Sequence, residues 1–330
     1  MDITNPESSG TRMFFGEIEE IVDEVESRFN MFKNFDIIPN PPDDHIFLKN
    51  NKYSSRVLLG SPLRQKIEKE WDLLKKNLPN SIFVRVYESR VDLMRVAIIG
   101  PPNTPYDHAL FFFDIYFPKN YPSNPPKLCY RSYGLDLNPN LRPGGKVCLS
   151  MLSTGYERII HKYWYACYTQ DWNPKESSIL NVLYASQGLI MCEKPYPIDE
   201  YNKKAFELTC GIMIRVLREP PMNFEDFVKG YFRKRAHPIL WKFRQEFDCY
   251  KDQIMIIELF NNLYKVLESN GTYCIHHLCF LKSRKGNTEE EKEEEEESRN
   301  YMRYFMKIAK TLKNLAESLA KLKHASKETV

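Results

Sequence analysis

Cys148 lies in a segment whose turn residues give its thiol a defined position. The segment 137–149 contains an Asn-Pro-Asn turn at 138–140 and a Gly-Gly pair at 144–145, shortly before the cysteine. Asparagine, proline and glycine favour tight turns because they fix or permit the backbone angles that turns require. A thiol placed in this way can act as a nucleophile that accepts an acyl group and passes it on as a thioester.

A cysteine that hydrolyses its substrate needs a histidine base within hydrogen-bond reach. His108 falls in a turn before a predicted strand, and His161 falls in an aromatic-rich segment; neither has a motif around it. This argues against a Cys–His hydrolase. An acyl carrier needs only an accessible thiol, a favourable thiolate environment and a hydrogen-bond donor for the oxyanion. The side-chain amide of Asn140 is the candidate donor.

The elements that position this segment are a helix and a set of strands before it. Ser61 and Pro62 supply an N-cap and a first-turn proline, and apolar residues at helical spacing continue to Leu78. Segments rich in β-branched or aromatic residues predict strands at 82–88, 93–99, 109–116 and 127–130. Their short connections predict an antiparallel meander, because parallel pairing needs longer crossovers.

Helices are predicted on either side of these strands. Residues 17–33 have apolar side chains on one helical face, which would pack on the core or contact a partner, and residues 36–60 are predicted to be a linker. After an aromatic-rich loop at 153–173, helices are predicted from Asn173-Pro174, over about 200–218, from an Asn223 cap, and over 238–273. The predicted fold class is therefore α+β, with helices segregated at the ends of the strands.

An acidic run at 289–297 precedes a last helix with an apolar seam and a lysine-rich opposite face. Such runs are usually solvated linkers. The helix has three alternatives open to it: a coiled coil, intramolecular docking, or contact with a membrane surface.

Composition excludes several classes of protein. The chain has 330 residues, 42% of them hydrophobic, and a formal net charge of +3. This charge is too small to favour nucleic-acid binding. No apolar run has the length of a transmembrane segment, and the N-terminus lacks a signal pattern. The expected location is the cytoplasm, the nucleus or both.

The eight cysteines form no CxxC pair and no disulfide framework. Cys274 and Cys279 flank His276 and His277, but their spacing fits no standard structural zinc pattern and no second ligand pair is evident. The sequence therefore predicts no metal site.

Several of these motifs resemble those of ubiquitin-conjugating (E2) enzymes, over roughly residues 61–234. Residues 100–106 (GPPNTPY) are similar to the GPxxTPY turn, and residues 111–127 to the FxxxIxFPxxYPxxPPK pattern. Asn138-Pro139-Asn140 with Cys148 eight positions later has the spacing of the HPN motif and the catalytic cysteine. Residues 172–174 (WNP) are similar to the WxP that opens the next helix. Segments 137–140, 145–150, 187–190 and 194–196 resemble the large subclass that includes hybrid E2/E3 enzymes. Segments 220–227 and 232–235 are most similar to plant members linked to phosphate homeostasis.

The resemblance implies a UBC fold and a role for each matching residue. Cys148 would take ubiquitin from an E1 by thioester exchange and yield it to a substrate lysine, with or without an E3. Asn140 would stabilise the oxyanion or order the loop, and Asn138 would have the structural role of the usual histidine. Pro105 and Tyr106 would shape a turn that buttresses the sheet. ATP would be used by the E1, so no cofactor is implied for this chain.

Some residues depart from the family pattern. Glu193 and Asp199 are the candidates for the acidic gate residue that orients the incoming lysine, and each has the alternative of a solvated carboxylate. Ser123 occupies the position where small E2s carry an apolar residue that binds RING domains, which argues against ordinary RING docking, whereas Pro174 matches the second docking loop. Two alternatives stay open: a non-catalytic, E2-like ubiquitin-binding module, and conjugation of another ubiquitin-like protein.

The predicted organisation has five parts. They are an N-terminal extension (1–60), a UBC core (61–237), a helical extension (238–280), an acidic linker (281–300) and a C-terminal amphipathic helix (301–325). The substrate, the chain linkage, the need for a separate E3 and the oligomeric state do not follow from the sequence.

Overall fold

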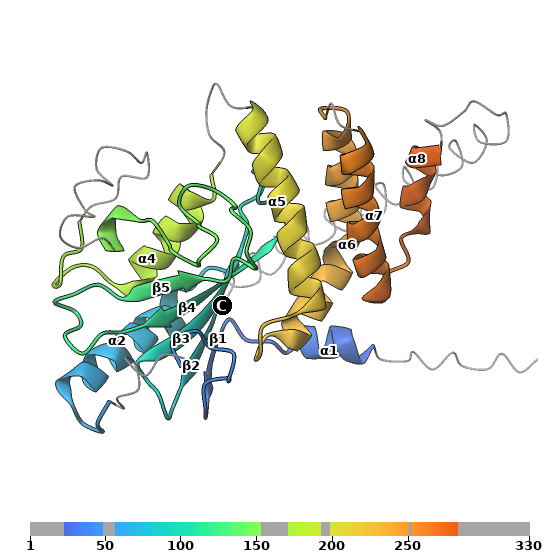
Figure 1. The fold of residues 1–330 in the computed structure, drawn as a ribbon. Coiled ribbons are helices and arrows are strands. Elements are labelled where there is room, and N and C mark those ends of the chain that lie inside the picture. The colour runs from blue at the N-terminus through green and yellow to red at the C-terminus, as the bar shows by residue number, and fades with distance from the viewer. Residues whose placement is uncertain (1–22, 49–56, 153–170, 193–198, 251–252, 283–330) are drawn as a thin grey trace, which may run out of the picture.

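The structure, a computed structural model, describes residues 23–48, 57–152, 171–192, 199–250 and 253–282. Its centre is a five-stranded sheet in the order β1-β2-β3-β4-β5 (Figure 1). The strands are β1 (Phe35–Ile38), β2 (Ile82–Tyr87), β3 (Leu93–Ile99), β4 (Leu110–Tyr116) and β5 (Lys127–Tyr130). The pairs from β2 to β5 are antiparallel, so the predicted four-stranded meander is confirmed, with each boundary within one residue.

The prediction of a linker over 36–60 is wrong at its start. β1 pairs in parallel with β2, in the register Phe35↔Val84 to Ile38↔Tyr87. β1 thus forms the edge of the sheet beside β2. Backbone hydrogen bonds from Val84 N to Asn34 O (2.6 Å) and from Glu88 N to Ile38 O (3.0 Å) belong to this pairing.

A buried ion-pair network fixes the residues that follow β1. Arg95 of β3, 1% exposed, donates two hydrogen bonds to Asp114 (2.6 and 2.9 Å) and one to Asp44 (2.6 Å). Arg131 also donates to Asp44 (2.6 Å), and Arg95 reaches the carbonyl of Met222 before α6 (3.2 Å). Paired, hydrogen-bonded carboxylates offset the cost of burying the guanidinium. The network therefore joins the N-terminal segment, the sheet and the C-terminal helices.

Helices surround the sheet on two sides, and Figure 1 shows α5, α6, α7 and α8 together, away from α2. The helices are α1 (Glu24–Asn30), α2 (Pro62–Asn77), α4 (Ile179–Ala185), α5 (Asp199–Arg218), α6 (Glu225–Phe247), α7 (Gln253–Ser269) and α8 (Cys279–Lys282). Shorter turns are η2 (Ser150–Leu152), the π-helical η3 (Ser186–Ile190) and η4 (Ile275–Leu278). Ser61 caps α2, as predicted, by accepting from Arg64 N (3.3 Å). None of the helices in the described part of the chain is both long and apolar enough to cross a membrane.

The described part of the predicted helix 17–33 is α1, and it packs on the core rather than standing free. Phe29 and Phe32 stack on Phe227 of α6, with ring centroids 5.6 and 4.8 Å away. A side-chain carbon at Gly230 would lie 2.3 Å from Cβ of Phe29, so the glycine permits this close approach.

Two predicted helix starts are wrong. The helix expected from Asn173-Pro174 begins at Ile179 instead, where Ser178 supplies the N-cap and accepts from Asn181 N. Residues 174–176 form a turn before it. Asn223, expected to cap α6, has a φ of 71°, and Phe224 takes the N-cap position without a side-chain cap bond. Once started, α6 continues through Pro238, across the boundary predicted between the core and the extension.

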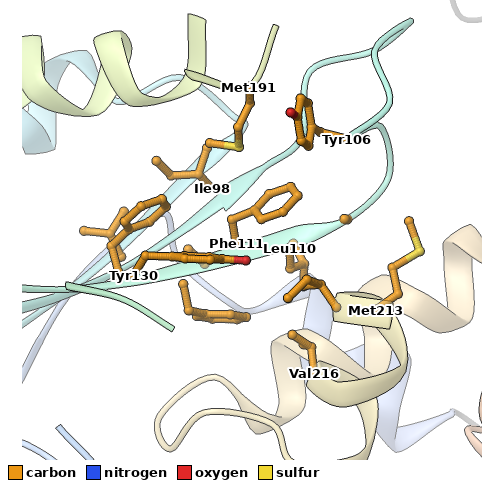
Figure 2. Close-up of a cluster of buried hydrophobic side chains, with 14 of the residues drawn as sticks. Ile98, Tyr106, Leu110, Phe111, Tyr130, Met191, Met213 and Val216 are labelled. Carbon is orange, nitrogen blue, oxygen red and sulfur yellow. The ribbon is translucent and has the colours of Figure 1, made fainter. Parts of the chain in front are cut away.

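One cluster of buried apolar side chains joins the sheet to α2, α4, α5, α6 and α7. Figure 2 shows the part near the start of β4, where Tyr106 and Phe111 make an edge-to-face contact with ring centroids 6.0 Å apart. Met213 and Val216 bring α5 into the same cluster (Figure 2). The turn at Tyr106 is thus anchored in the core that carries the candidate site.

Candidate active site

Asn138 organises the turn before Cys148 through its side chain. Its Oδ1 accepts hydrogen bonds from the backbone N–H groups of Asn140 (2.8 Å) and Leu141 (2.9 Å). This is the local side chain-to-backbone bonding that asparagine provides in turns. Asn138 is 4% exposed, so the turn is closed by bonds that water does not compete for.

Asn140 and Cys148 are held together by two hydrogen bonds. The backbone N–H of Cys148 donates to the carbonyl of Asn140 (2.8 Å), and Nδ2 of Asn140 donates to the carbonyl of Cys148 (2.7 Å). Asn140 is 3% exposed. This pair of bonds, called the Asn140–Cys148 clamp below, fixes the backbone that carries the thiol.

Gly145 lies in the turn that joins Asn140 to Cys148, the two residues of the clamp. Its φ is 80°, a conformation that suits glycine, and an added side-chain carbon would lie 2.5 Å from Sγ of Cys129 and 2.7 Å from the carbonyl of Tyr130. Its carbonyl accepts from Tyr130 N (2.7 Å), which attaches the turn to the end of β5. Of the two glycines at 144–145, Gly145 is therefore the one that the turn requires.

Two distant segments anchor the turn to the rest of the fold. Nδ2 of Asn138 donates to the hydroxyl of Tyr106 (3.1 Å) and lies 3.4 Å from the carbonyl of Ile190 at the end of η3. The Tyr106 hydroxyl is also 3.1 Å from that of Tyr201 in α5. The sequence predicted that Tyr106 supports the sheet but gave no signal that its hydroxyl would reach Asn138, because that contact spans 32 residues.

Cys148 follows a backbone bridge between Leu141 and Val147 and lies two residues before the start of η2. It is 6% exposed. All the described cysteines are outside disulfides. Burial raises the pKa of Cys129 and of Cys274 to about 11, and raises that of Cys210 further, so these three thiols stay protonated at neutral pH.

The remaining predicted site residues are not brought to Cys148 by any described contact. Glu193 and His161 lie outside the described residues. Asp199 is the first residue of α5, and its side chain is also outside them. His108 has a φ of 65° and a half-buried side chain whose pKa is lowered by burial.

The two loops of the predicted docking surface are attached to each other. The Trp172 indole N–H donates to the carbonyl of Pro122 (2.7 Å), and the rings of Trp172 and Tyr121 are 5.8 Å apart. Ser123 and Pro174, the two residues compared with the family pattern, are both exposed. A small polar side chain and a proline therefore face solvent from adjoining loops.

Comparison with known proteins agrees with this fold. The profile of the family "Ubiquitin-conjugating enzyme" matches residues 66–212, which include Asn138, Asn140 and Cys148. In Arabidopsis thaliana, ubiquitin-conjugating enzyme E2 39 is 40% identical over 239 residues, which make up 67% of this chain and 70% of that protein. The chain belongs to the ubiquitin-conjugating enzyme family, and its fold is the UBC fold.

Other relatives are much longer than this chain. Arabidopsis thaliana ubiquitin-conjugating enzyme E2 24 is 41% identical over 226 residues, 63% of this chain but 24% of that protein. A human protein named dual E2 ubiquitin-conjugating enzyme/E3 ubiquitin-protein ligase BIRC6 is 35% identical over 193 residues, 54% of this chain and 4% of that protein. This chain thus spans about a quarter of the first relative's length.

Proposed function

We propose that this chain accepts ubiquitin from an E1 activating enzyme as a thioester on Cys148 and transfers it to a lysine of a protein substrate. Membership of the family supports this function, and the observation that carries it is the Asn140–Cys148 clamp. A thiol in a core needs no such attachment, whereas a nucleophile must keep a fixed position relative to the group it attacks.

The proposed chemistry is two successive acyl transfers. The Cys148 thiolate attacks the carbonyl carbon of the E1–ubiquitin thioester, the E1 thiolate leaves, and ubiquitin is then bonded to Cys148. A neutral lysine amine next attacks the same carbonyl carbon, the Cys148 thiolate leaves, and the amine proton passes to a base. The product is an isopeptide bond. No cofactor takes part in either step, because ATP is consumed upstream by the E1.

Each transfer passes through a tetrahedral oxyanion that a nearby donor can stabilise. Asn140 is the proposed donor, and in the structure its amide is bonded to the carbonyl of Cys148. Asn140 therefore either keeps that bond and positions the thiol, or turns toward the oxyanion when the intermediate forms. Asn138 has a structural role in the proposal because its oxygen and its nitrogen are both used to hold the turn. Glu193 and Asp199 remain the candidates for orienting the lysine.

The low exposure of Cys148 favours one alternative, a non-catalytic module that binds ubiquitin without forming a bond. At 6% exposure the thiol cannot meet a carbonyl carbon on another protein unless neighbouring residues move. The proposed function therefore requires that contact with E1 or ubiquitin exposes Cys148.

A further proposal concerns the ligase. The human relative's name includes an E3 activity, and Ser123 is exposed where the family pattern has an apolar RING contact. We propose that the chain transfers ubiquitin without a RING-type E3. Transfer that begins only when such an E3 is added would contradict this part of the proposal.

A loading assay separates these alternatives. The chain is mixed with E1, ATP and ubiquitin and run on a non-reducing gel, together with Cys148→Ala and, as a matched control, Cys249→Ala, which removes an exposed thiol. We expect a reductant-sensitive adduct in the wild type and in Cys249→Ala, and none in Cys148→Ala. If ubiquitin gives no adduct but a related modifier does, the chain conjugates that modifier rather than ubiquitin. If none gives an adduct and ubiquitin still binds, the chain is a binding module.

A further inference from the structure

Three histidines meet in the C-terminal extension, away from the segment that carries Cys148. His237 lies in α6, and His276 and His277 lie in η4, which connects α7 to α8. One ligand nitrogen from each of the three histidines can be chosen so that all lie within 4.8 Å of one another. Two segments about forty residues apart in the sequence are thus joined by imidazole rings.

The separation of the nitrogens is close to that of a metal-bound set. Zinc binds histidine nitrogen at about 2.0–2.1 Å in tetrahedral geometry, which places neighbouring ligand nitrogens about 3.3 Å apart. Nδ1 of His237 and Nε2 of His277 are 3.1 Å apart. The nitrogen of His276 must move closer by at most roughly 1.5 Å to complete the set.

A hydrogen bond between His237 and His277 is the alternative explanation for their short distance. That bond uses Nε2 of His277, which is the nitrogen that a metal ion would bind, and it does not involve His276. A metal ion would hold all three rings, because one nitrogen of His276 also lies within 4.8 Å of the other two ligand nitrogens.

The charge state of the rings suits a metal ion. Burial, followed by the neighbouring histidines and Arg244, lowers the pKa of His277 to about 3, and burial also lowers the pKa of His237 and His276. A metal ion binds the neutral form of imidazole through the lone pair of a ring nitrogen. Arg244 opposes any cation, but its guanidinium lies over the ring of Phe280, 5.0 Å from the centroid.

We propose that His237, His276 and His277 bind a divalent transition-metal ion, and that zinc is the ion they hold. Three imidazoles without a carboxylate favour zinc over magnesium or calcium, which prefer oxygen ligands. His237 is exposed, so solvent has access from that side and a water molecule can take the fourth position.

The expected role of the metal is structural. Arg233 already attaches the residues before η4 to α6, through hydrogen bonds to the carbonyl of Asn270 (3.1 Å) and from Thr272 (3.4 Å). A metal at His237, one helical turn further along α6, would fix η4 as well. The three histidines lie beyond residue 212, where the family match ends.

Zinc titration of the full chain tests the proposal. After treatment with a chelator and its removal, zinc chloride is added in a calorimeter, and thermal unfolding is recorded with and without zinc. We expect one zinc per chain and a higher unfolding midpoint. His237→Ala, at an exposed position, should weaken binding by more than about 100-fold, because losing a ligand costs at least as much as losing the groups that support one. His108→Ala, which removes a histidine outside the cluster, should bind as the wild type does.

Cobalt distinguishes the ligands. Cobalt bound by three imidazoles gives visible d–d absorption without a thiolate-to-metal charge-transfer band. A charge-transfer band, unchanged zinc affinity in His237→Ala, or no binding by the wild type would each overturn the proposal. Circular dichroism of His237→Ala must match the wild type for its loss of binding to count.

Discussion

The turn that carries Cys148 and the cluster of three histidines are held by different kinds of contact. The turn is closed within eleven residues, by the side chains of Asn138 and Asn140 bonding to nearby backbone groups. The histidine cluster depends on α6 and η4 lying side by side, and the hydrogen bond between His237 and His277 joins residues forty positions apart. The first arrangement is dictated mostly by local sequence, and the second exists only when the helices are packed.

The two regions nevertheless share one foundation. The same cluster of buried apolar side chains contains strands of the sheet and helices of the extension, and Arg95 bonds to residues on both sides. The two regions therefore differ in how their functional groups are brought together rather than in how they are supported. Substitutions in the shared foundation should affect both regions, and substitutions within one region should leave the other intact.

The largest expected effect is on the shared foundation. Arg95→Met leaves Asp114 and Asp44 without their buried partner and should lower the free energy of unfolding by about 3–5 kcal/mol. Chemical denaturation measures this loss. Arg64→Met is the control, because its pair with Glu68 is partly exposed and worth about 0–1 kcal/mol. Equal, small losses in both variants would contradict the role given to the network.

Asn140→Ala should have the next largest effect, and only on the catalytic turn. Loss of an oxyanion donor slows such reactions by about 10²–10³-fold. We expect this loss in the discharge of ubiquitin to lysine, whereas thioester formation should be largely kept, because exchange between two thiolates has a lower barrier than attack by an amine. Single-turnover loading and discharge assays measure the two steps. An equal loss in both would show that Asn140 acts only by positioning Cys148.

The contrast between local and long-range contacts also explains what the sequence could predict. Strand β3 was predicted with its observed limits because a mostly apolar run of seven residues contains three β-branched side chains, and the positions of Asn140 and Cys148 follow from their spacing. β1 was missed because a four-residue segment with three apolar side chains, beside several prolines, carries little signal without the partner strand.

Other misses have the same origin. The start of α4 was misplaced because the buried carboxylate of Glu70 binds the N–H of Ile179, a contact across 109 residues. His237 could not be grouped with His276 and His277 because no spacing rule links a helix interior to a turn forty residues later. Only the packed structure brings these groups together.

A smaller effect should come from the long-range anchor of the turn. Tyr106→Phe removes the hydroxyl that accepts from Asn138 and should cost about 1 kcal/mol or slightly more in unfolding free energy, because the site is buried. Tyr184→Phe is the control, since its hydroxyl bonds to the carbonyl of Asn77 at an exposed position. We expect less than half the loss there. A stability loss in the control as large as that of Tyr106→Phe would remove the evidence for an anchor.

The last prediction is that a substitution in the histidine cluster does not change the rate of ubiquitin loading. His237→Ala should load ubiquitin at the wild-type rate in the presence or absence of zinc, because the cluster shares no described contact with Asn138, Asn140 or Cys148. Loading rates measured with E1 in excess provide the check. A loading defect in His237→Ala would mean that the two regions are coupled.

The central claim is that ubiquitin is bonded to Sγ of Cys148. It is tested most directly by Cys148→Ser with E1, ATP and ubiquitin. A serine at this position should form an oxygen ester, so the adduct should survive reductant and be lost on treatment with mild alkali. The wild-type adduct should be lost in reductant. A reductant-sensitive adduct that persists in Cys148→Ser would place ubiquitin on another cysteine and contradict the account.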